Sequence, residues 1–203
     1  DANNVAIGSN AGAAVTTGTN NTLIGGLAGD ANTTGGYNVA IGDRALTTNT
    51  TASGNVGVGA DALFANTTGA SNTAIGSDSL KANTTAANNT AVGKGALAAT
   101  TGRDNTAVGF QAGTTNIGGV ENTALGMYAL RFNTTGNGNT ALGLQALHRN
   151  TTASNNTAVG YQAGEQITIG TQNVLVGTLA GDALTDSDEN VAIGYGALSS
   201  DTL

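Results

Sequence analysis

His148 is the only histidine of the chain, so it is the first residue to test as a catalytic base. A catalytic site needs a base, a nucleophile and a group that orients them. The chain consists of repeated units, and in other units the place of His148 is taken by residues of both charges: Asp30, Lys81, Arg131, Glu165 and Asp182. A place so variable is typical of a solvated surface. We therefore expect that the protein is not an enzyme and has no catalytic residues.

Acidic and glycine-rich segments are the other candidates for chemistry. Asp186, Asp188 and Glu189 lie within one turn and could attract Ca²⁺, which prefers carboxylate oxygens. They lack the Gly-Gly-x-Gly-x-Asp signature of calcium-binding rolls, which favours a solvated acidic turn. Gly25-Gly26 and Gly57-Val58-Gly59 could suggest phosphate loops, but no helix follows to present its N-terminus. The sequence thus predicts neither a metal site nor a cofactor.

Composition argues against several classes of protein. The 203 residues include 32 Gly and no Pro, Cys or Trp. Phosphate binding needs clustered Lys and Arg, whereas this chain has a net charge of −7 and six scattered basic residues, so no nucleic acid is expected as a partner. No apolar run approaches the roughly 18 residues of a membrane span. Apolar residues make up 39% and are regularly spaced, which favours a thin repetitive core over disorder.

An asparagine followed by a short β-rich string recurs along the whole chain. The string reads Asn-Thr/Val-Ala-Ile/Val-Gly, and it repeats every 17 residues, except for one interval of 16 after Asn89. We number each of the twelve units from this asparagine as position 1. The asparagines are Asn4, Asn21, Asn38, Asn55, Asn72, Asn89, Asn105, Asn122, Asn139, Asn156, Asn173 and Asn190. We treat residues 1–203 as a single repeat array and expect it to be part of a longer polypeptide, because stacked coils need covered ends.

Each unit predicts one coil of a parallel β-solenoid, or β-roll, which places the protein in the all-β class. Positions 1 to 5 alternate as a strand does, and positions 12 to 15, often Asn-Thr-Thr-Gly, carry turn residues. We expect a first strand, a bend at the invariant glycine of position 5, a second short strand around positions 8 and 9, and a return turn. Twelve coils stacked at about 4.8 Å make a rod roughly 58 Å long.

The alternation leaves open which face of the first strand points into the coil. We assign positions 2 and 4 to the interior, because they hold Thr or Val and Ile, Val or Leu. Ile75 at position 4 should then be buried on all sides. Positions 3 and 5 form an outward Ala/Gly stripe suited to contact with another chain, for example at Ala91 and Ala124. The residues expected to have structural roles in three representative units are Asn72, Ile75, Gly76, Asn89, Val92, Gly93, Asn122, Leu125 and Gly126.

Positions 9 and 12 are expected to share one interior volume. Position 9 is Leu in seven units and Gly in five, and no Leu unit has an apolar residue at position 12. Three Gly units carry Val15, Ile167 and Leu184 there, and a fourth has Ile117 one place later. One side chain would fill what the other leaves empty, as in volume-conserving core swaps. Only the unit of Gly29 breaks the pattern.

Asparagines at positions 1 and 12 are expected to stack in side-chain ladders, as asparagines do in cross-β structures. Several of the asparagines at position 12 also form Asn-x-Thr sequons, which are candidate glycan sites in a eukaryotic secretory chain. These are Asn32, Asn49, Asn66, Asn83, Asn133 and Asn150. Because these asparagines all fall at one position of the unit, the repeat accounts for the Asn-x-Thr pattern, and glycosylation is not needed to explain it.

The tandem N-T-A-V-G string resembles the head repeats of trimeric autotransporter adhesins, which carry N-S-V-A-I-G-type strings. The closest strings are Asn4-Val5-Ala6-Ile7-Gly8, Asn38-Val39-Ala40-Ile41-Gly42 and Asn190-Val191-Ala192-Ile193-Gly194. The 17-residue form, with Ala-Leu before Asn-Thr-Thr-Gly, also looks like arrays in bacterial surface and phage tail-fibre proteins. The resemblance implies a left-handed parallel β-roll with three chains around one axis.

The expected function is that of a non-enzymatic extracellular rod: a bacterial surface adhesin, a phage tail fibre or a secreted filament. We expect a homo-oligomer, either a trimer or an end-to-end filament, located outside the cell, on its surface or on a virion. A host-cell surface or glycan receptor is the external partner that this role implies, with any ligand contact at the variable positions 6, 7 and 10. An ice-binding solenoid is the alternative, with the Thr pair of positions 13 and 14 as its array.

Overall fold

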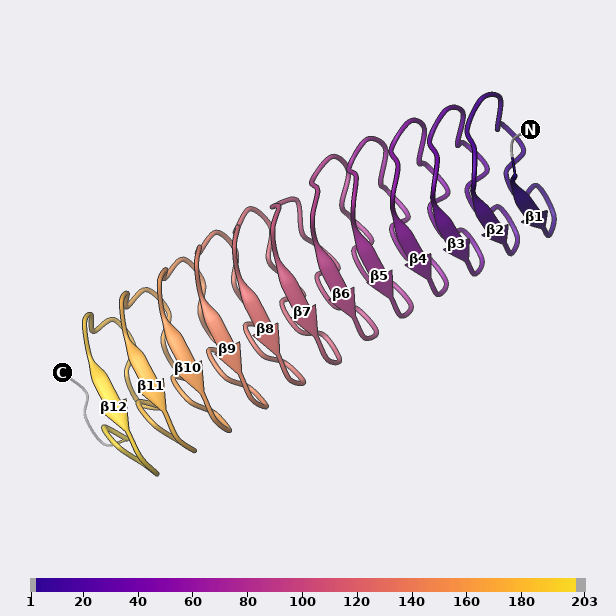
Figure 1. Ribbon diagram of the computed structural model, residues 1–203. Helices are drawn as coiled ribbons and strands as arrows, with labels where there is room; N and C mark the ends of the chain where they lie inside the picture. Colours follow the sequence, from indigo (N-terminus) through magenta and orange to yellow (C-terminus); the bar gives the residue numbers. More distant parts are fainter. Residues whose placement is uncertain (1–2, 200–203) are drawn as a thin grey trace.

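The computed structural model describes residues 3–199 as a straight rod of stacked coils, with β1 at one end and β12 at the other (Figure 1). Each coil contributes one strand of three residues, at positions 2 to 4 of its unit. The strands are β1 (Val5–Ile7), β2 (Thr22–Ile24), β3 (Val39–Ile41), β4 (Val56–Val58), β5 (Thr73–Ile75), β6 (Thr90–Val92), β7 (Thr106–Val108), β8 (Thr123–Leu125), β9 (Thr140–Leu142), β10 (Thr157–Val159), β11 (Val174–Val176) and β12 (Val191–Ile193). They form one parallel sheet in chain order, which confirms the all-β parallel solenoid.

The strands stay in register across the one short unit. Thr90 of β6 pairs with Thr106 of β7, and Ala91 pairs with Ala107, as equivalent positions do elsewhere. The Thr100 N–H still donates to Leu97 O, and the Asp104 N–H donates to Ala87 O, as in the other coils. The missing residue therefore comes out of the return turn between these two points, and the strand keeps its register.

The interior face of the sheet is the opposite of the one that the sequence predicted. Position 3 points into the coil, where Ala74 and Ala91 are fully buried. Position 4 points to solvent: Ile75 and Leu125 are each 41% exposed, and Val92 is partly exposed. The prediction of an interior Ile/Val/Leu column, with Ile75 buried on all sides, is wrong.

The narrowness of the coil explains this arrangement. A Cβ built on Gly57, the glycine at position 3 of β4, would lie 3.4 Å from Leu46 Cγ and 3.3 Å from Ala62 O. An alanine therefore already fills the space between the sheet and the leucine of position 9. A branched side chain fits at position 3 only where position 9 has no side chain, since interiors are close-packed.

The segment after the strand does not form the second short strand that was expected. Positions 7 and 9 adopt left-handed backbone conformations, as in Arg44 (φ 54°) and Leu46 (φ 51°). The Arg44 N–H donates to Gly26 O of the preceding coil at 2.8 Å, and the Leu46 N–H donates to Ala62 O of the following coil at 3.0 Å. The backbone is thus bonded to both neighbours, but its alternating conformation cannot be that of an extended strand.

The invariant glycine of position 5 is required by two constraints at once. Gly76 has φ +128°, and a Cβ there would lie 2.6 Å from the carbonyl carbon of Gly93 in the next coil. Gly93 and Gly126 are in the same situation against Gly109 and Gly143. Any side chain at these glycines would need both a strained backbone and a shift of the neighbouring coil.

Positions 9 and 12 do share the interior, as predicted. Six of the position-9 leucines are buried at 2% exposure or less, and so are Ile167 and Leu184 at position 12, while Val15 is partly buried. Ile117 is an exception, because it is 52% exposed and fills no interior space. A Cβ on Gly113 of that unit would instead lie 2.9 Å from Leu97 Cδ2 of the preceding coil.

In the unit of Gly29, which broke the pattern, the side chain at position 3 fills the interior space that positions 9 and 12 leave empty. A Cβ on Gly29 would lie 2.8 Å from Leu23 Cδ2, and Leu23 is 1% exposed. Leu175 has the same relation to Gly181. A left-handed leucine at position 9 costs about 1–2 kcal/mol, so a glycine there relieves backbone strain when another side chain supplies the volume.

Two ladders of buried asparagine run along the rod, as predicted. At position 1, the Asn72 N–H donates to Asn55 Oδ1 at 2.9 Å, and Asn72 Nδ2 donates to Ala86 O at 2.9 Å. At position 12, Asn66 Nδ2 donates to Asn49 Oδ1 at 3.1 Å. Apart from Asn4 and Asn190 at the two ends, which are partly buried, the asparagines at both positions are almost fully buried, among them Asn89 and Asn122. Their amides are therefore structural groups, and the Asn-x-Thr pattern follows from the ladder.

Candidate functional surface

The outer face of the sheet is the most regular surface of the rod. Position 2 gives a column of Thr in seven coils and Val in five, and position 4 gives a parallel column of Ile, Val or Leu. The position-4 side chains of β5, β8 and β9 are each about 40% exposed. No charged residue lies in either column. The face is therefore a continuous, uncharged and largely apolar strip along the described part of the chain.

The Ala/Gly stripe proposed as a contact surface is not available for contact. Ala91 is fully buried and Ala124 is 2% exposed, because position 3 points into the coil. Position 5 lies against the backbone of the neighbouring coil. The expected interface at positions 3 and 5 is therefore wrong, and the outer columns of positions 2 and 4 take its place as the exposed apolar strip.

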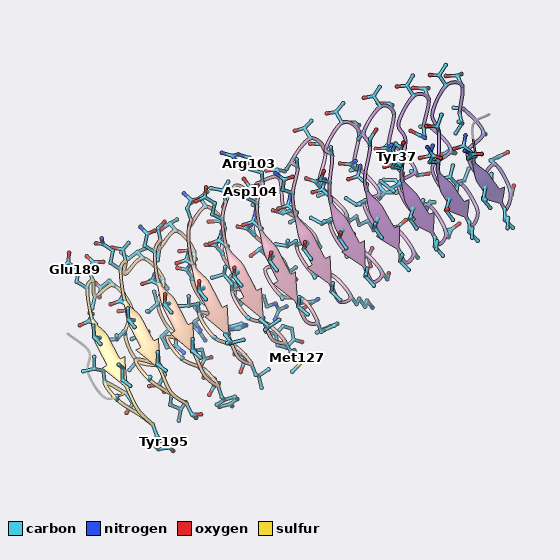
Figure 2. The ribbon with its side chains drawn as sticks, in the orientation of Figure 1. Tyr37, Arg103, Asp104, Met127, Glu189 and Tyr195 are labelled. Atoms are coloured by element: carbon cyan, nitrogen blue, oxygen red, sulfur yellow. The ribbon has the colours of Figure 1, made fainter. Side chains whose placement is uncertain are left out.

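One edge of the rod is apolar in its C-terminal half. Position 6, which follows the invariant glycine, carries Phe110, Met127, Tyr161 and Tyr195 in coils 7, 8, 10 and 12. These side chains are 39%, 44%, 44% and 81% exposed. Figure 2 shows Met127 and Tyr195 projecting from this edge, whereas Arg103, Asp104 and Glu189 lie along the opposite edge, on the return turns.

A cluster of rings and cations wraps the coils from β7 to β9. The rings of Phe110 and Tyr128 lie 5.5 Å apart, those of Tyr128 and His148 lie 6.1 Å apart, and those of Phe132 and His148 lie 5.0 Å apart, all edge-on. The Arg131 guanidinium lies 4.6 Å from the centre of the Tyr128 ring and 5.0 Å from that of Phe132. Position 11, the place of Phe132, was not among the variable positions singled out from the sequence.

His148 is partly buried within this cluster rather than solvated as expected. Neither of its ring nitrogens has a hydrogen-bond partner. Burial lowers the pKa of His148 below its ordinary value, and the positive charges of Arg131 and Arg149 lower it further. A neutral imidazole packed edge-on against two rings makes the same contacts as an aromatic side chain.

Ion pairs lie at the corresponding surface of coils 3 to 5, beside the Phe64 ring, whose centre is 5.6 Å from the Arg44 guanidinium. Arg44 Nε lies 2.9 Å from Asp61 Oδ1, Lys81 Nζ lies 3.0 Å from Asp61 Oδ2, and Lys81 Nζ lies 2.7 Å from Asp78 Oδ1. Lys81 lowers the pKa of Asp78, and the two carboxylates raise the pKa of Lys81. These pairs link three successive coils, and each stabilises them by at most about 1 kcal/mol because the lysine and arginine are exposed.

The acidic turn near the C-terminus is held by hydrogen bonds. Asp188 Oδ1 accepts bonds from the Thr171 backbone N–H and hydroxyl, which lower the pKa of the Asp188 carboxyl. Within residues 3–199, no three His, Asp or Glu side chains gather closely enough to hold a metal ion. Over the same range, no helix has the length and apolar character needed to cross a bilayer.

The comparisons with known proteins return no relative. No protein-family model, no curated protein and no solved structure matches this chain. The fold and the surfaces described above are therefore the basis for any functional conclusion.

Proposed function

We propose that the protein is a structural rod, a surface fibre or adhesin shaft, that associates side by side with further copies of itself through the outer face of its sheet. The observation that carries this proposal is the uncharged Ile/Val/Leu column of position 4, which lies outside the coil from β1 to β12. Contiguous exposed apolar patches beyond a few hundred Å² are characteristic of interaction surfaces. The resemblance to trimeric adhesin heads and phage fibres supports a location outside the cell or on a virion.

The repeat itself supports a second copy as the occupant of this face. A partner that matches one coil matches every coil, because the spacing along the rod is constant and the columns are straight. A parallel copy offers the same spacing and the same lack of charge, so each additional coil adds the same contact. The thin interior of the rod gives a further reason, since a single chain of this kind buries little large apolar surface on folding.

Charge placed in the position-4 column tests the proposal. The double variant Leu125→Lys and Leu142→Lys puts two cations in neighbouring coils of the contact and should convert the oligomer to monomer. Thr135→Lys and Thr152→Lys, on exposed residues of the return turns of the same two coils, are the matched control and should leave the oligomer intact. Sedimentation velocity at micromolar concentration measures both; a wild-type chain that stays monomeric contradicts the proposal.

An ice-binding surface is the second candidate, and the outward threonines of position 2 suit it better than the Thr pair of positions 13 and 14. The hydroxyls of position 13 are already used, as where Thr33 Oγ1 and Thr134 Oγ1 donate to the Thr50 and Thr151 carbonyls of the next coils. The position-2 threonines instead point outward, and among the described residues their hydroxyls form no hydrogen bond within the chain. Seven of them lie on the outer face of the sheet: Thr22, Thr73, Thr90, Thr106, Thr123, Thr140 and Thr157. A monomer that shapes ice crystals, and loses this activity in Thr106→Lys, would favour this candidate over the rod.

A further inference from the structure

An open groove of about 600 Å³ lies on the face formed by positions 10, 11 and 13 of coils 7 to 9. Its lining consists of Thr115, Ile117, Phe132, Thr134, His148, Arg149 and Thr151. We call the three position-13 residues, Ile117, Thr134 and Thr151, the floor of the groove. A volume of this size lies within the range of small-molecule sites, about 300–1,000 Å³. The groove does not involve positions 2 and 4, so the proposed association of rods leaves it open.

Three successive coils depart from the repeat along the groove: coils 8 and 9 at position 11, and coil 7 at position 13. In coils 1 to 6, position 11 is Ala in five coils and Thr in one. In coils 8 and 9 it is Phe132 and Arg149, which are both exposed and rise beside the floor. Ile117 takes the place of the Thr that other coils carry at position 13.

The floor of the groove is apolar despite its threonines. Thr134 Oγ1 donates to Thr151 O at 2.9 Å, and Thr151 Oγ1 donates to Thr168 O at 3.0 Å. These hydroxyls are engaged with backbone carbonyls. Together with Ile117 and the Phe132 ring, the threonine methyl groups make a surface with few polar partners for a ligand.

Positive charge at the groove is not neutralised. Arg149 forms no ion pair and no side-chain hydrogen bond with the described residues, whereas Arg44, Lys81 and Arg103 each pair with an aspartate. Arg131 stacks on rings and also lacks a carboxylate partner within the described range. Glu165 follows His148 in the position-10 column, but it forms no ion pair with either arginine. In a chain with a net charge of −7, a free guanidinium beside an apolar floor is unusual.

We propose that this groove binds a small carboxylic acid with a flat apolar body, which lies on Ile117 and Phe132 while its carboxylate pairs with the Arg149 guanidinium. Arginine binds carboxylates through two parallel hydrogen bonds, which fixes the orientation of such a ligand. A sugar acid would bring the same carboxylate but several hydroxyls, for which the floor offers few partners. The apolar acid is therefore the ligand class that the groove fits.

Isothermal titration calorimetry of the full chain with 2-naphthoate tests this site. We expect saturable 1:1 binding that weakens about ten-fold in Arg149→Gln, because a charge-assisted hydrogen bond is lost. Arg103→Gln, on the return turn of coil 6 and outside the residues that line the groove, is the matched control and should bind as the wild type does. Ile117→Thr restores the repeat residue and should also weaken binding, by removing apolar floor.

Two further probes separate the contributions of charge and of the apolar body. The neutral analogue 2-naphthalenemethanol should bind the wild type about as weakly as Arg149→Gln binds naphthoate. N-acetylneuraminic acid, a sugar acid, should bind more weakly than naphthoate. Equal binding of the neutral analogue, tighter binding of the sugar acid, or no saturable binding of naphthoate at millimolar concentration would each overturn the proposal. Unchanged unfolding midpoints of the variants show that the loss is not one of folding.

Discussion

Coils 1 to 6 and coils 7 to 12 share one interior but have different surfaces. Both halves carry buried alanine at position 3 and buried leucine at position 9. At position 6, the first half has Ser9, Gly26, Asp43, Ala60, Ser77 and Lys94, and the second has Phe110, Met127, Leu144, Tyr161, Thr178 and Tyr195. Ion pairs link coils in the first half, and edge-on contacts between rings do so in the second. The interior thus specifies the coil, while the outward positions are free to vary, and at position 6 the large apolar side chains are all in the second half.

The short unit lies at the boundary of the two halves and leaves defects in both asparagine ladders. Thr100 replaces the asparagine of position 12, so Asn83 Oδ1 has no donor. In the shortened turn, Asn89 Nδ2 also has no partner. Farther along, Asn150 Oδ1 is unpaired for the same reason, because Ile167 takes position 12 in the next coil. A buried unpaired polar group costs about 1–3 kcal/mol, which makes coil 6 a weak point between the halves.

The largest effect should come from charge inside the coil, and it should be the same in both halves. Ala74→Asp in β5 and Ala141→Asp in β9 each place an unpaired charge in a fully buried position. Each should cost at least about 3 kcal/mol, a large part of the stability of an ordinary domain. Urea unfolding followed by circular dichroism measures the loss.

The neighbouring outward residues provide the control for these two variants. Ile75→Asp and Leu142→Asp should change the stability of the separated chain by less than about 1 kcal/mol, as surface substitutions do. A dilution series separates this small effect from any loss of association. Similar large losses for the inward and outward variants would show that the two faces are assigned incorrectly.

A smaller gain is expected from repair of the ladder at the boundary. Thr100→Asn supplies the amide that Asn83 Oδ1 lacks and should stabilise the protein by about 1 kcal/mol. Thr84→Asn, on an exposed residue of the return turn of the preceding coil, is the control and should have no comparable effect. The gain would appear in the unfolding midpoint, and its absence would mean that the short coil already satisfies the carbonyl in another way.

The smallest effect concerns His148 in the second half. Because its pKa in the folded chain lies below the ordinary value of 6.5, the unfolded chain binds a proton first as the pH falls. The stabilising contribution is therefore complete above pH 6.5 and is lost as the pH falls through the folded pKa. The midpoint of unfolding should decline below this pH in the wild type and decline less in His148→Gln. Parallel pH profiles for the two proteins would count against the packing of the neutral imidazole.

Much of the fold could be predicted from the sequence, because the period, the invariant glycine and the asparagines each have one structural use. Hydrophobicity could not show which face of the strand points into the coil. It favours position 4 as the interior position, because Ile, Val and Leu there are larger and more apolar than the Ala of position 3. One signal was available: position 3 is leucine only in Leu23 and Leu175, and both units have glycine at position 9. That exchange places position 3 beside position 9, inside the coil.

The candidate surfaces could not be predicted from the sequence of any single unit, because each surface combines residues from several coils. The groove brings together Ile117, Phe132 and Arg149 from three successive coils, at places that are small or polar elsewhere. Only the stacking of coils places them side by side. The sequence identified positions 6, 7 and 10 as variable, but position 11 could be recognised only once the outward direction of each residue was known.

Thiol labelling of two adjacent single-cysteine variants tests most directly that the apolar column of position 4 faces outward and joins copies of the chain. The wild type has no cysteine, so Ala74→Cys and Ile75→Cys each introduce one thiol. Ile75→Cys should react rapidly in dilute solution, become protected as the concentration rises and form an interchain disulfide on oxidation. Ala74→Cys should stay unreactive until the chain unfolds. Rapid labelling of Ala74→Cys, or labelling of Ile75→Cys that is independent of concentration, would contradict the account.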